Sequence, residues 1–236
     1  MTFMQSVNPK TCRQPTTVAV SRATRRDLLE LSIGYGLILL VVWTPQPCQR
    51  IFFWAALAWI AAVTVVSFDG ARAMGLHRRG FLRSLWIVAL AMLLAAVAVT
   101  LAERFHTSHI PASPALLVRR YWGYAIWAFL QEFLLLDFFL LRLLRIVPQV
   151  KMAVIAAASL FTIAHLPSPI LTAVTLLWGL SACLLFLRYR SLYTLGMAHV
   201  IFGVCVAVTL PLTATHNMKV GLGYLKYRPP ALTAVR

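Results

Sequence analysis

Acidic residues are the scarcest feature of this sequence, and charge as a whole is low. Only 12% of the 236 residues are charged, whereas 61% are apolar. A soluble domain has about 25% charged and 45–50% apolar residues. The mean hydropathy is +0.80. This composition excludes an ordinary globular enzyme, a disordered chain and a nucleic-acid-binding module, and it predicts a multi-span membrane protein.

Basic residues outnumber acidic ones by 22 to 6, which gives a net charge of +16. Such an excess could indicate nucleic-acid binding, but these residues lie between apolar runs and not in one patch. Positive-inside topology and contact with anionic lipid headgroups explain it better. We expect four of the acids in tails or loops and two inside an apolar run; the six are Asp27, Glu30, Asp69, Glu103, Glu132 and Asp137.

Cysteine is also rare, and its spacing indicates neither a disulfide framework nor a zinc ribbon. The four residues are Cys12, Cys48, Cys183 and Cys205. We therefore expect them to be structural or incidental.

Apolar runs of near-membrane length fill most of the chain. A membrane-spanning helix needs about 20 such residues, and these runs lack the alternation of barrel strands, so helices are expected. The predicted fold is an all-α polytopic membrane bundle with about seven transmembrane helices. The runs cover approximately residues 28–45, 51–68, 84–102, 120–141, 150–166, 169–187 and 191–213.

The chain is predicted to be one bundle flanked by two basic tails. Counting Lys and Arg on each side favours a cytosolic N-terminus, in a multi-pass protein of a bacterial cytoplasmic membrane. The expected parts are a cytosolic tail over 1–26, three transmembrane helices over 27–119, a four-helix core over 120–213 and a C-terminal tail over 214–236.

Two acids stand out within the fourth run. Glu132 lies near the expected centre of the bilayer, where an unpaired carboxylate costs at least about 2.5 kcal/mol and usually serves function. Asp137 is five residues further on, about 140° around an α-helix, and is expected on a different face. We expect Asp137 to be structural and to reach Arg142 or the membrane interface.

Two histidines also lie in apolar runs. His165 precedes two prolines at the end of the fifth run, and His199 lies between Gly196 and Gly203 in the seventh. Each could be structural, as a helix-end cap or as part of a close helix contact. Together with Glu132 they form a plausible zinc constellation, because zinc prefers imidazole and carboxylate ligands and can acidify a bound water.

These residues resemble the motifs of the CPBP intramembrane protease family, which includes CAAX prenyl endopeptidases and bacteriocin-processing (Abi) relatives. The matching pieces are Gln131-Glu132, Phe161-x-x-x-His165 and His199, within residues 120–210. The resemblance implies zinc-dependent cleavage of a membrane-associated peptide or protein in contact with the lipid bilayer. Glu132 would activate water, and His165 and His199 would position the Zn²⁺ or the water.

Three positions depart from the family pattern. Gln131 replaces a glutamate, Leu136 stands where an arginine is usual, and Gly203 stands where an asparagine is frequent. The missing asparagine removes a donor for a developing oxyanion. Two alternatives therefore stay open: a catalytically weak relative that acts as an immunity or scaffold protein, and a small proton-coupled transporter that uses Glu132 and His199.

Overall fold

A computed structural model describes residues 17–68 and 70–228, and over these residues the chain is helical with no β-strand. The predicted all-α fold class is confirmed. The elements are α1 (Thr17–Trp43), α2 (Cys48–Val66), α3 (Arg78–Arg104), α4 (Pro114–Phe133), η1 (Leu134–Leu140), α5 (Leu141–Ile146), α6 (Val150–Ile163), α7 (Pro169–Tyr189), α8 (Leu192–Thr209), α9 (Leu212–Thr215), η2 (His216–Met218) and α10 (Gly221–Leu225).

Five helices of the described residues are long and apolar enough to cross a membrane, which indicates a membrane-embedded protein. They are α2, α3, α7, α8 and the continuous helix Pro114–Ile146 that joins α4, η1 and α5. Large apolar side chains on α2 and α3 are exposed, including Trp54, Val65 and Leu93, as expected for surfaces that face lipid. The other two predicted runs correspond to α1, which is not among the five, and to α6, whose 14 residues extend only about 21 Å.

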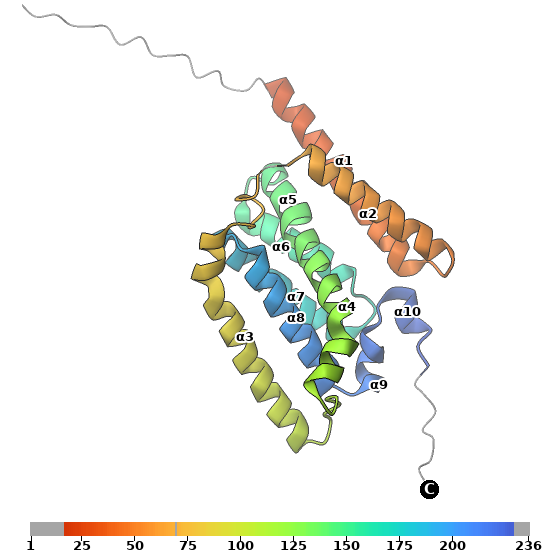
Figure 1. Cartoon of the computed structure of the whole chain (residues 1–236). Coiled ribbons are helices and arrows are strands. Elements are labelled where there is room, and N and C mark those ends of the chain that lie inside the picture. Colours follow the sequence, from red (N-terminus) through yellow and green to blue (C-terminus); the bar gives the residue numbers. More distant parts are fainter. Residues whose placement is uncertain (1–16, 69, 229–236) are drawn as a thin grey trace, which may run out of the picture.

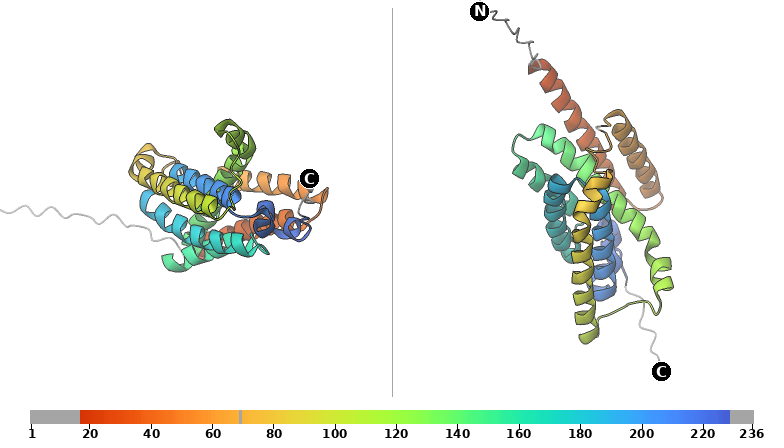
Figure 2. Two further views of the ribbon diagram at one scale, coloured as in Figure 1. Left: turned by 90° about the horizontal axis from the view of Figure 1, so that it is seen from below. Right: turned by 60° about the vertical axis from the view of Figure 1, so that its left-hand side comes forward.

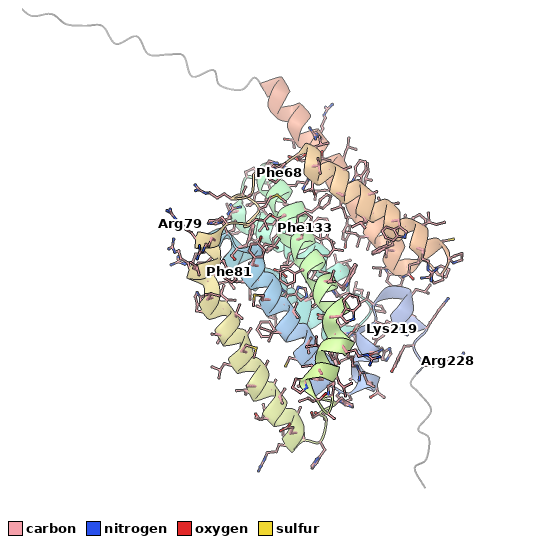
Figure 3. The ribbon with its side chains drawn as sticks, in the orientation of Figure 1. Phe68, Arg79, Phe81, Phe133, Lys219 and Arg228 are labelled. Atoms are coloured by element: carbon pink, nitrogen blue, oxygen red, sulfur yellow. The ribbon has the colours of Figure 1, made fainter. Side chains whose placement is uncertain are left out.

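The helices form a central group with one helix or helix pair on either side (Figures 1 and 2). α1 and α2 pack together on one side, whereas α3 packs along α8 on the other. Between them α4 packs on α8, and α6 packs on α7. Figure 3 shows Arg79 near the start of α3. It places Lys219 and Arg228 beside the C-terminal helices, across the ribbon from Arg79.

The first two acids lie within α1, because this helix begins at Thr17 and not at the end of the predicted tail. Asp27 and Glu30 are buried. Asp27 accepts hydrogen bonds from the Arg145 guanidinium at 2.9 and 2.8 Å, and Glu30 accepts one from Arg142 at 3.0 Å. The prediction that these acids lie in a tail or loop is therefore wrong: they attach α1 to α5.

A π-helical turn, η1, interrupts the long helix in its middle. Its i→i+5 hydrogen bonds place an extra residue in each turn, so residues five apart, such as Glu132 and Asp137, come nearer to one face than in an α-helix. Arg142 donates to the carbonyl oxygens of Asp137 and Phe138, at 3.4 and 3.1 Å. Arg142 therefore binds Glu30 and the η1 backbone. It does not bind the Asp137 carboxylate, which was one of the two contacts predicted for that acid.

The C-terminal residues up to 228 fold back onto the bundle, unlike the tail predicted from residue 214. The amide of Gly221 donates to the Leu166 carbonyl at 2.8 Å. Gly221 has a φ of +53° and lies so close to Val42 that a Cβ would overlap the Val42 carbonyl. The His216 ring stacks on Tyr224 at 3.9 Å between centroids. This segment therefore closes the end of the bundle beside the α6–α7 turn.

Candidate functional site

A largely apolar cavity of about 250 Å³ lies among α1, α2, α4, α6, α7 and α8. Aromatic and aliphatic side chains form most of its wall, and Met218 and Val220 of the C-terminal segment close part of it. A cavity with an apolar lining and a few polar groups is the usual form of a ligand site. Gln131, Phe161, His165, His199 and Gly203, five of the residues predicted for the site, line it.

Glu132 lies behind the cavity wall and is fully buried. Its Oε2 accepts hydrogen bonds from His199 Nδ1 at 2.8 Å and from Trp178 Nε1 at 3.0 Å, whereas its Oε1 is buried without a partner. A carboxylate only accepts, so His199 Nδ1 carries the proton. His199 Nε2 is then left as an unprotonated acceptor, in the arrangement of a histidine general base with an orienting carboxylate.

His165 lies just beyond the end of α6 and is held by the backbone of that helix. Its Nδ1 lies 2.7 Å from the Phe161 carbonyl oxygen, so Nδ1 is the donor and Nε2 an acceptor. Gln131 Nε2 lies 3.4 Å from His165 Nε2, a long contact. Gln131 thus contacts His165, while its neighbour Glu132 contacts His199.

Phe161 stands between the two histidines. Its ring centroid lies 4.8 Å from that of His165 and 6.0 Å from that of His199, both edge-to-face. The sequence spacing Phe161-x-x-x-His165 places the first pair one helical turn apart. Chain folding brings His199 of α8 to the other side of the same ring.

The two glycines of α8 accommodate aromatic rings from α4. A Cβ at Gly196 would overlap the Phe129 ring, and one at Gly203 would overlap the Tyr124 hydroxyl. Small residues at i and i+7 therefore let α4 approach α8 closely. The two glycines therefore form the close helix contact expected around His199, and side chains of α4 fill the space beside them.

The predicted zinc set is not assembled as a triad in the part of the chain that the structure describes. Across residues 17–68 and 70–228, no three His, Cys, Asp or Glu side chains are grouped so that they could hold a metal ion. Oε2 of Glu132 is shared by His199 and Trp178, while its Oε1 is buried without a partner, and Glu132 does not line the cavity that the two imidazoles face. Among the described residues, Glu132 is therefore a hydrogen-bond partner of an imidazole.

Two further residues of the site escaped the sequence argument. Trp178 lies in an apolar run and looks like any core aromatic, yet it hydrogen-bonds Glu132. Tyr124 lies in the middle of α4, seven residues before Gln131, and the notch at Gly203 connects it to α8. Leu136, which stands where the family usually has an arginine, is fully buried in the apolar core.

Comparison of the chain with protein-family models, with curated proteins and with solved structures finds no match. The resemblance to the CPBP family therefore rests on the motif residues alone.

Proposed function

We propose that the protein is a membrane-embedded peptidase of the CPBP type, which hydrolyses a peptide bond in a membrane-associated peptide or protein. One observation carries the proposal: the His199–Glu132 hydrogen bond of 2.8 Å, buried in a membrane helix bundle, at the wall of a cavity. An ionisable pair in this setting is expensive and usually serves function.

The histidine acts as the base. His199 Nε2 takes a proton from a water molecule as the water oxygen attacks the carbonyl carbon of the peptide bond. Glu132 holds the imidazole in the required tautomer and stabilises the imidazolium that forms. His199 then returns the proton to the leaving nitrogen, which yields a carboxylic acid and an amine. Glu132 was predicted to activate water directly, but its burial behind the cavity wall favours this indirect role.

His165 is the second polar group of the cavity that faces the substrate. Phe161 and Gln131 contact its two ring nitrogens, so the ring is held in place with Nε2 as an acceptor. It is suited to orient the attacking water or an N–H group of the substrate. The apolar remainder of the wall suits aliphatic or aromatic groups of a chain that enters from the bilayer.

The residues present do not fit the zinc site that the family resemblance implies. A catalytic zinc usually has three protein ligands, and here two imidazoles face the cavity while Glu132 is engaged with His199 and Trp178. The proposed reaction therefore runs through water, His199 and Glu132.

The test uses the full chain in liposomes with a library of quenched fluorescent peptides, each with an apolar half that inserts into the bilayer. We expect cleavage by the wild type and none by His199→Ala. The matched control His109→Ala removes a histidine that is exposed and lies outside the cavity, and it should cleave like the wild type. No cleavage by the wild type would contradict the proposal and favour the scaffold alternative.

A second candidate is proton-coupled transport, and the buried acids favour it specifically. Both carboxylate oxygens of Asp137 and Oε1 of Glu132 are buried without a hydrogen-bond partner among the described residues. Intramembrane carboxylates in this state are typical of proton relays. Uptake into the same liposomes that requires a pH gradient and is lost in Asp137→Asn would support transport, whereas peptide cleavage unaffected by Asp137→Asn would favour the peptidase.

A further inference from the structure

A tyrosine of α4 reaches the cavity through the notch at Gly203. The Tyr124 hydroxyl occupies the place where the first side-chain atom of any other residue at 203 would stand. Gly203 follows His199 by four residues on α8, so the two positions are neighbours on one helix face, about 5–6 Å apart. The phenol therefore lies about one helical turn from His199, on the same wall of the cavity.

Most other polar atoms of this wall are already engaged. The Tyr35 hydroxyl donates to the Leu160 carbonyl at 3.0 Å, and the Thr175 hydroxyl donates to the Leu171 carbonyl at 2.7 Å. Trp178 donates to Glu132. These groups cannot serve a substrate without giving up a hydrogen bond that they already make.

Tyr124 is an exception. Its hydroxyl forms no hydrogen bond with any residue that the structure describes, and Tyr124 lines the cavity with that hydroxyl against Gly203. The indole of Trp127 is also uncommitted, but Trp127 is 40% exposed and packs near Phe53, on the α2 side of the cavity. Beside His199, Tyr124 supplies the free O–H donor.

A donor at this place matters because the two histidines cannot supply one. With Nδ1 protonated in each ring, both present an acceptor nitrogen to the cavity. Hydrolysis of an amide moves an electron pair onto the carbonyl oxygen, and this oxyanion needs a hydrogen-bond donor fixed in advance.

We propose that the Tyr124 hydroxyl is the oxyanion donor of the site. As the water oxygen bonds to the carbonyl carbon, the C=O π pair moves to oxygen and accepts a hydrogen bond from Tyr124. When the pair returns, the C–N bond breaks, and the nitrogen takes the proton held by His199. This inference rests on the proposed peptidase function and adds a catalytic residue to it.

The experiment compares Tyr124→Phe with two matched controls outside the cavity, Tyr121→Phe and Tyr193→Phe, on the first library peptide that the wild type cleaves. Loss of one oxyanion donor lowers kcat by about 10²–10³-fold, and we expect this for Tyr124→Phe with KM unchanged. The controls should stay within a few fold of the wild type. A kcat for Tyr124→Phe within a few fold of the wild type would overturn the proposal.

A second measurement separates chemistry from packing. A phosphinate that replaces the scissile bond of the same peptide mimics the tetrahedral intermediate. We expect Tyr124→Phe to weaken inhibition by this phosphinate in the same proportion as it lowers kcat/KM. In the inactive His199→Ala variant, adding Tyr124→Phe should leave the affinity for the uncleaved peptide unchanged. An equal loss of affinity for the phosphinate and for the uncleaved peptide would assign Tyr124 a structural role and overturn the proposal.

The two proposals fail in different ways. If the wild type cleaves and His199→Ala does not, while Tyr124→Phe remains active, the peptidase stands and only the oxyanion donor is wrong. If the wild type cleaves no peptide, the peptidase function fails first, and the assignment of Tyr124 fails with it.

Discussion

Two pairs of buried acids occupy opposite kinds of environment in this molecule. Asp27 and Glu30 on α1 are matched by Arg145 and Arg142 on α5. Glu132 and Asp137, on the α4–η1 helix, pair with no Arg or Lys among the described residues. Charges that hold helices together need a partner of opposite sign, whereas unmatched carboxylates in a membrane bundle indicate chemistry or proton transfer.

The largest expected effect is a loss of catalysis when Glu132 is replaced. Replacement Glu132→Gln keeps the shape and the contact with Trp178 but cannot orient the tautomer of His199, so kcat should fall by about 10⁴-fold. The matched change Glu30→Gln should leave kcat per folded molecule within a few fold. Peptide cleavage by the two variants in liposomes measures the contrast. Equal activity losses would remove the distinction between the two pairs.

The next largest effect should be a loss of stability when Arg142, the buried ion-pair partner of Glu30, is replaced. Arg142→Met leaves Glu30 paired only with Arg26, whose side chain is 55% exposed, and removal of one member of a buried ion pair costs about 3–5 kcal/mol. The free energy of unfolding in mixed detergent micelles should drop by up to this amount. The double variant Arg142→Met with Glu30→Leu should regain most of it. A full loss retained in the double variant would mean that contacts of Arg142 with the η1 carbonyls dominate.

A smaller effect should follow from the indole that supports Glu132. Trp178→Phe removes one hydrogen bond to a charged group, worth about 1.5–3 kcal/mol. We expect kcat to fall about 10- to 100-fold and the unfolding free energy to fall by no more than about 3 kcal/mol, since the ring still packs against Phe202. Steady-state kinetics beside unfolding curves would decide this, and a loss of stability with normal kcat would contradict the role.

The ion pair between Asp27 of α1 and Arg145 should contribute little to stability. Arg145 is 38% exposed, and partly exposed pairs contribute at most about 1 kcal/mol. Arg145→Gln should therefore lower the unfolding free energy by no more than this, in contrast to Arg142→Met, and less so at high salt. A loss as large as that of Arg142→Met would show that burial does not separate the two pairs.

The smallest expected effect is that of metal removal. Because Glu132 is engaged by His199 and Trp178, dialysis against a strong zinc chelator should leave kcat unchanged. Activity that disappears on chelation and returns with Zn²⁺, and not with Mg²⁺, would contradict the water–histidine mechanism. Zinc would then have to be held by His165 and His199 with a ligand that the geometry does not assign.

Composition and the lengths of the apolar runs predicted the helices. The two histidines found inside those runs line the cavity, as do Gln131, Phe161 and Gly203, which the family resemblance singled out. The acids of α1 were misplaced because their partners Arg142 and Arg145 are more than a hundred residues away along the chain, and local polarity alone favours a tail. The π-helical turn gave no signal, since Leu134–Leu140 is as apolar as its neighbours. It changes which face Asp137 occupies, and regular α geometry cannot anticipate that change.

The roles within the site depended on distances that no motif contains. Gln131-Glu132 predicts a carboxylate at the site, but only the fold shows that Glu132 lies behind His199 while Gln131 contacts His165. In the sequence, Gly203 indicates only that the asparagine donor frequent in the family is missing. The structure shows a notch filled by Tyr124, which comes from a helix that begins nearly ninety residues earlier.

Cleavage of the liposome peptide library by the wild type, Glu132→Gln and Glu103→Gln tests the central claim most directly. Glu103 is an exposed acid near the end of α3, so its variant controls for loss of an acid as such. The account predicts new peptide termini with the wild type and Glu103→Gln, and none above background with Glu132→Gln. Cleavage by Glu132→Gln at the wild-type rate would contradict it.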